Sequence, residues 1–259
     1  MEHQEYKEQI IRKVTEIGNG AHIFAPREWL DEEVLIVRLK KSIKEEIIKL
    51  AYPHLDKIIA VFLYGSHARN EQTEKSDVDV VVISKEPFEL KKENFDIVVI
   101  PENKIKKAIE LNPILLYSVI NEAKPIINGN YLEILKREKI ELKYFKNYIE
   151  ETKRLIKINK SEISLYGGKE IAPNSVIYSL MLRLRGIFII DKLMKKEKFS
   201  NLEFKSWIIK NSEADYEKVY KIYSSLRDDK KEKNIVPIAQ AESLLSLLEN
   251  ETKRIENKI

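Results

Sequence analysis

Two aspartates, Asp77 and Asp79, lie in the apolar run DVDVVVI (77–83), which otherwise has the composition of a buried strand. Side chains alternate along a strand, so both carboxylates point to the same side, about 6.6 Å apart along it. Unpaired carboxylates at the edge of a core cost free energy, which a cation between them would offset. Because Mg²⁺ prefers oxygen ligands and keeps substrate phosphates in its coordination sphere, the pattern predicts a magnesium site.

A third carboxylate, Asp96, stands near the start of the next apolar run, FDIVVI (95–100), with Glu93 close by. If this strand lies beside 77–83, Asp96 can join the same site. Three carboxylates can hold two metals about 3.5–4 Å apart, an arrangement suited to in-line phosphoryl displacement. Asp96 could instead only cap its strand, and we favour the metal interpretation.

Gly65 and Ser66 follow the apolar run IIAVFLY (58–64) and precede a short predicted helix that runs to about Glu71. A helix N-terminus offers free N–H groups and a positive dipole end to a phosphate, and glycine lets the backbone approach closely. The serine hydroxyl can add a further donor. The stretch from Gly65 to Asp79 therefore combines a phosphate site with a metal site, which is the chemistry of a nucleoside triphosphate.

Apolar periodicity predicts the elements that position these residues. In the first half we expect strands at 10–17 and 21–25 around the turn 18–20, a helical turn at 26–30, a strand at 34–37, helices at 40–52, 102–111 and from 112, strands at 58–64, 77–83 and 95–100, and a short strand before residue 128. In the second half we expect only helices, at 131–160, 176–196, 200–210, 215–227 and 236–255.

This order predicts an α+β fold in which a mixed, twisted sheet flanked by helices forms the core. The predicted domains are a β-hairpin segment at 1–38, a catalytic domain at 39–128 and a C-terminal helical bundle at 129–259.

Composition sets further bounds on the function. The chain of 259 residues has 34% charged residues and a net charge of +4, which permits a nucleotide or nucleic-acid partner without requiring one. It has no cysteine, which excludes disulfides and thiolate metal sites. The N-terminus does not have the composition of a signal peptide, and no apolar run reaches the ~18 residues that span a membrane. We therefore expect a cytoplasmic protein without a membrane partner.

The spacing Gly65-Ser66, ten residues, Asp77-x-Asp79 resembles the DNA polymerase β-like nucleotidyltransferases, especially their minimal and aminoglycoside-modifying branches. Ala68, Arg69 and Ser76 also match the fuller form of this motif, and the resemblance covers about residues 40–128.

The resemblance implies an enzyme of the transferase class that moves a nucleoside monophosphate, with AMP from ATP favoured, to an acceptor hydroxyl and releases pyrophosphate. Asp77, Asp79 and Asp96 would be the catalytic residues and would bind two Mg²⁺ ions, for which Mn²⁺ is an alternative. Gly65, Ser66, Arg69 and Ser76 would bind the nucleotide, although Arg69 could equally pair with a nearby carboxylate. The acceptor would be a small molecule or a protein, and nucleic-acid extension is less favoured.

The segment IGNGAHIFAPREWL followed by VLIV resembles the AbrB-like swapped-hairpin proteins over about residues 8–38, with Asp31 where those proteins have a glycine. This resemblance implies a homodimer and, as an alternative function, a DNA-binding or scaffolding dimer whose core senses a nucleotide without catalysis.

Two arginines lie within the apolar helix predicted at 176–196. Helical spacing predicts that Arg183 faces solvent. Arg185 shares its face with apolar residues, and a buried arginine needs a partner. It could reach a triphosphate or acceptor, but pairing with a structural carboxylate such as Asp191 is favoured. Lys169 and Glu170 are expected in a surface loop.

Overall fold

The computed structural model describes residues 8, 10, 12–36, 42–74, 76–165 and 171–259. Its contacts divide the chain into two compact units, Met1–Ser42 and Ile43–Ile259. The predicted boundary near residue 128 falls inside the second unit and stays a prediction. Among the described residues, no helix has the length and apolar character needed to cross a bilayer.

The first unit contains a small antiparallel hairpin, β1 (Thr15–Ile17) and β2 (Gly20–His22), and a 3₁₀ turn, η1 (Arg27–Trp29). Both strands are shorter than predicted. The strand predicted at 34–37 was wrong for 34–36, which form no strand, and Val37 lies outside the described residues. Strands are stable where they pair with other strands and cover an apolar core. Because no residue of 12–36 is buried, these strands have no core to cover. Asp31 has a φ of 68°, the conformation that favours glycine.

The second unit is built on a four-stranded sheet with the order β5-β4-β3-β6. Its strands are β3 (Ile58–Tyr64), β4 (Val78–Ser84), β5 (Phe95–Pro101) and β6 (Lys124–Ile127). β3 pairs antiparallel with β4 and β6, whereas β4 and β5 are parallel. The mixed sheet is therefore confirmed. β3 and β4 are buried almost throughout because both faces of the sheet are covered, which explains why their sequences are apolar runs without alternation.

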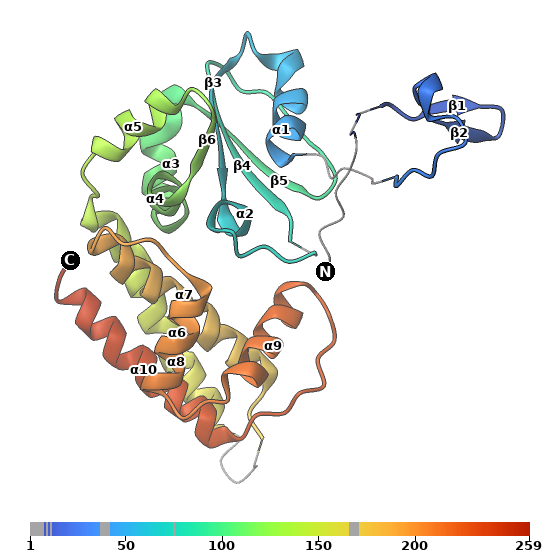
Figure 1. The fold of residues 1–259 in the computed structure, drawn as a ribbon. Coiled ribbons are helices and arrows are strands. Elements are labelled where there is room, and N and C mark those ends of the chain that lie inside the picture. Colours follow the sequence, from blue (N-terminus) through green and yellow to red (C-terminus); the bar gives the residue numbers. More distant parts are fainter. Residues whose placement is uncertain (1–7, 9, 11, 37–41, 75, 166–170) are drawn as a thin grey trace. The chain divides into compact units, whose positions relative to one another are not determined.

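Helices cover both faces of the sheet (Figure 1). Each face has its own apolar core. One core joins the sheet to α3 (Ile105–Leu111), α4 (Pro113–Glu122) and α5 (Gly129–Arg137). The other joins it to α1 (Ile43–Ala51) and to Ala68 of α2 (Gly65–Arg69). The 3₁₀ turns η2 (Tyr52–His54) and η3 (Glu102–Lys104) precede β3 and α3.

A third core lies among α6 (Lys146–Leu165), α7 (Asn174–Met194), α8 (Asn201–Asn211), α9 (Tyr216–Arg227) and α10 (Ile238–Glu256). These helices confirm the predicted helical C-terminal region. α4 contributes Leu116 and Val119 to the sheet core and Tyr117 to this one. The same short helix therefore packs on both, which explains why its sequence is apolar nearly all round.

The single long helix predicted over 131–160 was wrong, because α5 ends at Arg137 and α6 begins at Lys146 after the 3₁₀ turn η4 (Leu142–Phe145). Leu132 of α5 packs in the sheet core, whereas Phe145 and Ile149 pack in the helical core. A straight helix could not direct both sets of side chains into different cores. The Glu141 N–H donates to the Tyr117 hydroxyl at 2.9 Å, which holds the connection against α4.

Candidate active site

The three predicted catalytic aspartates lie at one end of the parallel strand pair. β4 begins at Val78, so Asp77 precedes the strand and is exposed, whereas Asp79 lies within it and is half-buried. β5 runs beside β4 with Asp96 in register with Asp79. The condition on which the third carboxylate depended, that the strand of Asp96 lies next to that of Asp79, is met.

Gly65 lies directly against Asp79. It follows β3, whose last residue Tyr64 pairs with Asp79 across the sheet. Gly65 has a φ of +69°, and a Cβ built there would meet Asp79 Oδ2 at 1.9 Å. Both the backbone conformation and this approach require glycine. The predicted phosphate-binding glycine and the predicted metal-binding aspartate are therefore in contact.

The electrostatics of this cluster are unfavourable in the protein alone. Burial raises the pKa of Asp79 to about 6, with Asp96 and Asp77 adding to the rise and Arg69 and His67 opposing it. Burial also raises the pKa of Tyr64, with Asp79, Asp96 and Glu122 adding to the rise. The carboxylates thus repel one another, and a bound cation would relieve this repulsion. The part of the chain that the structure describes contains no group of three His, Asp or Glu side chains placed to hold a metal ion.

The remaining motif residues lie in α2 and in the loop to β4. Ser66 is the second residue of α2, a helix of five residues. The Ser76 hydroxyl accepts from the Thr73 N–H at 2.9 Å and lies 3.2 Å from the Thr73 hydroxyl, which closes a turn within the loop. The nucleotide-binding roles of Ser66 and Ser76 stay predictions.

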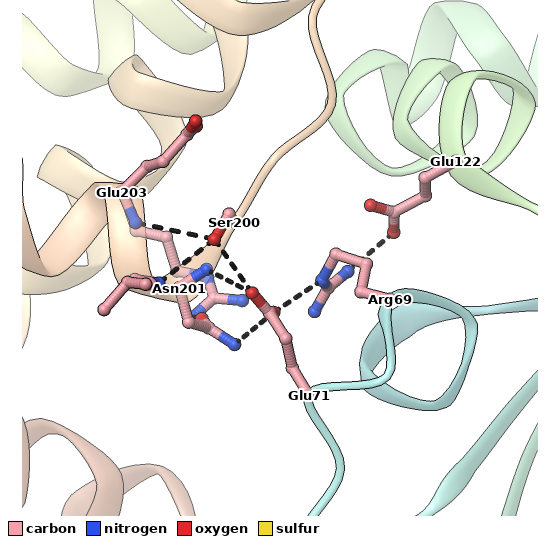
Figure 2. A network of polar contacts seen from close by, with 8 residues as sticks. Arg69, Glu71, Glu122, Ser200, Asn201 and Glu203 are labelled. Carbon is pink, nitrogen blue, oxygen red and sulfur yellow. Dashed lines mark hydrogen bonds and ion pairs between the residues drawn. The ribbon is translucent and has the colours of Figure 1, made fainter.

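Arg69 lies between two carboxylates (Figure 2). Its Nη1 donates to Glu122 Oε1 at 2.7 Å and its Nε to Glu71 Oε2 at 2.9 Å. The guanidinium also lies 5.2 Å from the centre of the Phe199 ring. Of the two alternatives for Arg69, pairing with a carboxylate is observed, and contact with a phosphate stays a prediction.

Glu122 and Glu71 were not predicted as parts of the site. Burial raises the pKa of Glu122, while Arg69 and a hydrogen bond with the Gly65 backbone oppose the rise. Burial alone would raise the pKa of Glu71, but hydrogen bonds from Arg69, Ser200 and Asn201 together lower it. Glu122 had a signal in the sequence, since it is the single charged residue in the predicted helix PILLYSVINE, whereas nothing local distinguishes Glu71.

The two arginines of α7 have defined partners. Arg183 is not solvent-facing as predicted: its side chain is 15% exposed, pairs with Glu151 at 3.1 Å and lies 4.9 Å from the Tyr148 ring centre. Asp191 is not the partner of Arg185, since it pairs with Lys195 and Arg254. Arg185 instead stacks on Phe199 and donates to Asn201 Oδ1.

Lys169 and Glu170 lie outside the described residues.

An open pocket of about 490 Å³ lies beside Asp96. It is lined by Leu90, Lys91, Lys92, Glu93, Phe95, Asp96 and Ile97. Asp96 is thus next to Asp79 through the strand register. It also lines a space that a second substrate could enter.

The chain is similar in sequence to known proteins. Residues 38–160 match the family described as "Nucleotidyltransferase domain". A protein of Methanocaldococcus jannaschii, named "Putative protein adenylyltransferase MJ0141", is 33% identical over 85 residues, which are 33% of this chain and 83% of that protein.

Two crystal structures are similar at low identity. The spectinomycin adenyltransferase AAD(9) of Enterococcus faecialis, with ATP and spectinomycin, has 14% identity over 81% of this chain and 97% of its own, with a TM-score of 0.44. A nucleotidyltransferase-like protein of Exiguobacterium sibiricum has 14% identity over 82% of this chain and 75% of its own, with a TM-score of 0.36.

Proposed function

Because the chain belongs to the nucleotidyltransferase family, we propose that it transfers AMP from ATP to a hydroxyl group of a protein and releases pyrophosphate. It is an enzyme of the transferase class, and the alternative of a DNA-binding or scaffolding dimer with a non-catalytic core is not favoured. ATP as the donor is supported by the name of the archaeal relative, which is an adenylyltransferase. We place the reaction in the cytoplasm, where ATP is abundant.

One observation carries the proposal: Asp79 lies in register with Asp96 on one side and against the backbone of Gly65 on the other. Phosphoryl transfer needs little covalent chemistry from a protein, and depends on positioning and on neutralising charge. A phosphate held at Gly65 and Ser66 would lie next to the carboxylates, so that donor and cation would share one site.

Nucleotidyltransferases of this family generally use divalent metals. We propose Mg²⁺, with two ions per site and Mn²⁺ as a substitute, held by Asp77, Asp79 and Asp96. Because the described residues contain no group of three such side chains already placed to hold a metal, these carboxylates would have to turn towards the ions on binding. The fit is supported by the donor set, since carboxylate oxygens suit a hard cation. Burial, with the neighbouring Asp96, also raises the pKa of Asp79, so a bound cation would stabilise the charged form of this carboxylate. When bound, the metal supplies charge neutralisation at the triphosphate.

Asp96 has a second role in the proposal. It is exposed and lines the pocket beside the strands, so it can accept the proton of an acceptor hydroxyl that enters there. Gly65, Ser66 and the N–H groups around them would orient the triphosphate. Arg69 and Ser76 would contribute to this part of the site as predicted from the motif.

The choice of a protein acceptor rests on the archaeal relative, which is named as a protein adenylyltransferase. The pocket at Asp96 is open, as a side chain presented by another protein would require. A small-molecule acceptor is the alternative that the test must separate.

The test is radiolabelled AMP transfer from ATP, with Mg²⁺ or with EDTA, to the proteins and separately to the small molecules of a cell extract. We expect label in a protein band, dependent on Mg²⁺ and lost in Asp77→Ala and Asp79→Ala. Label in the small-molecule fraction alone would show that the acceptor is a small molecule and not a protein. Undiminished label in Asp79→Ala would contradict the metal assignment, and no MgATP binding in calorimetry would contradict the activity.

We also propose a homodimer formed by the first unit. Its described residues expose eight large apolar side chains between 38% and 73%: Val14, Ile17, Ile23, Phe24, Leu30, Val34, Leu35 and Ile36. So many exposed apolar side chains within one short segment are typical of an interface. A second copy of the same hairpin offers a matching surface, and two-stranded hairpins alone are only marginally stable.

A further inference from the structure

The polar network around Arg69 connects the catalytic motif with the helical region. We propose that Glu71 is a positioning residue for the transfer reaction, because it fixes the motif segment to the first turn of α8. This inference rests on the proposed function.

Glu71 lies in the middle of the motif, five residues after Ser66 and six before Asp77. Its carboxylate accepts four hydrogen bonds. One comes from Arg69, at 2.9 Å. The other three come from the start of α8: the Ser200 hydroxyl at 2.9 Å, the Asn201 N–H at 3.0 Å and the Asn201 side-chain amide at 2.8 Å. Both oxygens are used, which fixes the orientation of the carboxylate.

The contact with α8 is electrostatically suited to a negative charge. α8 has eleven residues and begins at Asn201, with Ser200 as its N-cap. The free N–H groups and the positive dipole end of a helix N-terminus stabilise a carboxylate there. Side-chain exposure of 12% for Arg69 and 22% for Glu71 protects these bonds from much of the solvent screening. These hydrogen bonds join two segments that are 130 residues apart in the sequence.

The network also continues in the opposite direction, to the phosphate segment. Arg69 donates to Glu122 Oε1, and the backbone of Gly65 helps to oppose the rise in the pKa of Glu122. At the other end, Asn201 accepts from Arg185 of α7, and Phe199 lies between Arg69 and Arg185. Hydrogen bonds thus run from Glu122 through Arg69 and Glu71 to Ser200 and Asn201 at the start of α8 (Figure 2). Asn201 extends them to Arg185 of α7.

The consequence concerns the loop that leads to the aspartates. Residues 72–74 and 76–77 form no helix or strand, and in this stretch Thr73, Glu74 and Asp77 are exposed. Since Glu71 is held at the start of this loop and β4 at its end, releasing Glu71 would free the loop on one side. The phosphate segment and Asp77 would then be less well placed relative to each other, and nucleotide affinity would fall.

The test compares Glu71→Gln with Glu74→Gln, a matched substitution in the same exposed loop. Glu71→Gln keeps one acceptor oxygen, so two of the four donors to Glu71 lose their acceptor. We expect this variant to weaken MgATP binding in calorimetry roughly tenfold. Amide hydrogen exchange of residues 70–77 and 200–203 should become faster in the protein without nucleotide. Glu74→Gln should change neither measurement.

Asn201→Ala approaches the contact from α8, since it removes the side-chain amide and leaves the N–H of residue 201. It should give the same two changes, and the double variant with Glu71→Gln should show less than the product of the two losses. Asn201→Ala also tests the proposal if the Glu71→Gln variant does not fold.

Unchanged MgATP affinity in both variants would overturn the positioning role, even if their melting temperatures fell, because a purely structural contact predicts only the loss of stability. Unchanged hydrogen exchange at 70–77 would also overturn it. A wild type that binds no MgATP would instead remove the proposed function itself, and the positioning role with it.

Discussion

Asp79 carries a charge that the folded protein holds at a cost. The carboxylate is half-buried beside Asp96, and Arg69 and His67 oppose the rise in its pKa without cancelling it. We predict that Asp79→Asn, which keeps the shape and removes the charge, abolishes transfer but stabilises the protein without metal. A rise in Tm of about 2–4 °C in EDTA at pH 8 corresponds to ~1 kcal/mol in a chain of this size, a value discounted for solvent access.

The pH dependence of this gain has a defined sign. The pKa of Asp79 is about 6 in the folded protein, against an ordinary value of 3.8. Between these values the folded state holds the proton and the unfolded state does not, so ionisation disfavours folding. The cost is complete above about pH 6 and disappears as the pH falls towards 3.8. The Tm difference between Asp79→Asn and wild type should shrink over that range.

Asp77→Asn is the matched control for this stability effect, since Asp77 is exposed and lies outside the strand. It should lose transfer without the same gain in Tm. A Tm difference for Asp79→Asn that stayed constant from pH 8 to pH 4 would contradict the assignment of the gain to the carboxylate.

At the scale of elements, strands were predictable where a continuous apolar run is covered on both faces, as in β3, β4 and β5. The local sequence could not show that α5 and α6 serve different cores, because both have helical periodicity and the break depends on what each packs against. Nor could it show that 34–36, predicted as part of a strand, form none, because their apolar side chains lack a covered face. For these segments tertiary context outweighs local propensity.

The candidate site also has parts that the sequence could predict and parts that it could not. Asp77, Asp79 and Gly65 belong to one short motif, so their proximity followed from the order of strand, turn and strand. The parallel register that brings Asp96 to Asp79 depends on pairing, which the sequence left as a condition. The contacts of Glu71 with Ser200 and Asn201 cross about half the chain, and no local pattern marks them.

The packing of α6 against α7 provides a prediction at this scale. Gly186 lies in the middle of α7, and a Cβ built there would meet the Tyr148 hydroxyl at 1.8 Å and its Cζ at 2.4 Å. Alanine in place of a helical glycine favours the helix by up to about 1 kcal/mol, whereas overpacking costs about 1–3 kcal/mol. We expect overpacking to prevail, so Gly186→Ala should lower the free energy of unfolding measured in urea.

Tyr148→Phe removes the nearest of these atoms and gives the control. Its own cost should be small, since the hydroxyl makes one long hydrogen bond, 3.4 Å to the Arg183 carbonyl. In the Tyr148→Phe background, Gly186→Ala should cost less than in wild type. Equal costs in the two backgrounds would show that the helices move apart instead of straining at this contact.

At the scale of the whole molecule, the two units differ in how they are stabilised. The described part of the second unit has three apolar cores, two of which share α4, so its sheet and helices support each other. In the first unit, no described residue between 12 and 36 is buried. A segment without a core buries too little apolar surface to offset the conformational entropy lost on folding. Its order should therefore depend on a partner surface.

Removing residues 1–42 should therefore separate assembly from catalysis. We predict that 43–259 folds, binds MgATP with unchanged affinity and sediments as a monomer, whereas the full chain sediments as a dimer. Analytical ultracentrifugation and calorimetry measure the two properties independently. Phe24→Ser with Leu35→Ser, which alters two of the most exposed apolar side chains, should dissociate the dimer in the full-length chain. A dimer that survives the deletion would place the interface on the second unit, and a full chain that is monomeric at all concentrations would refute the proposed homodimer.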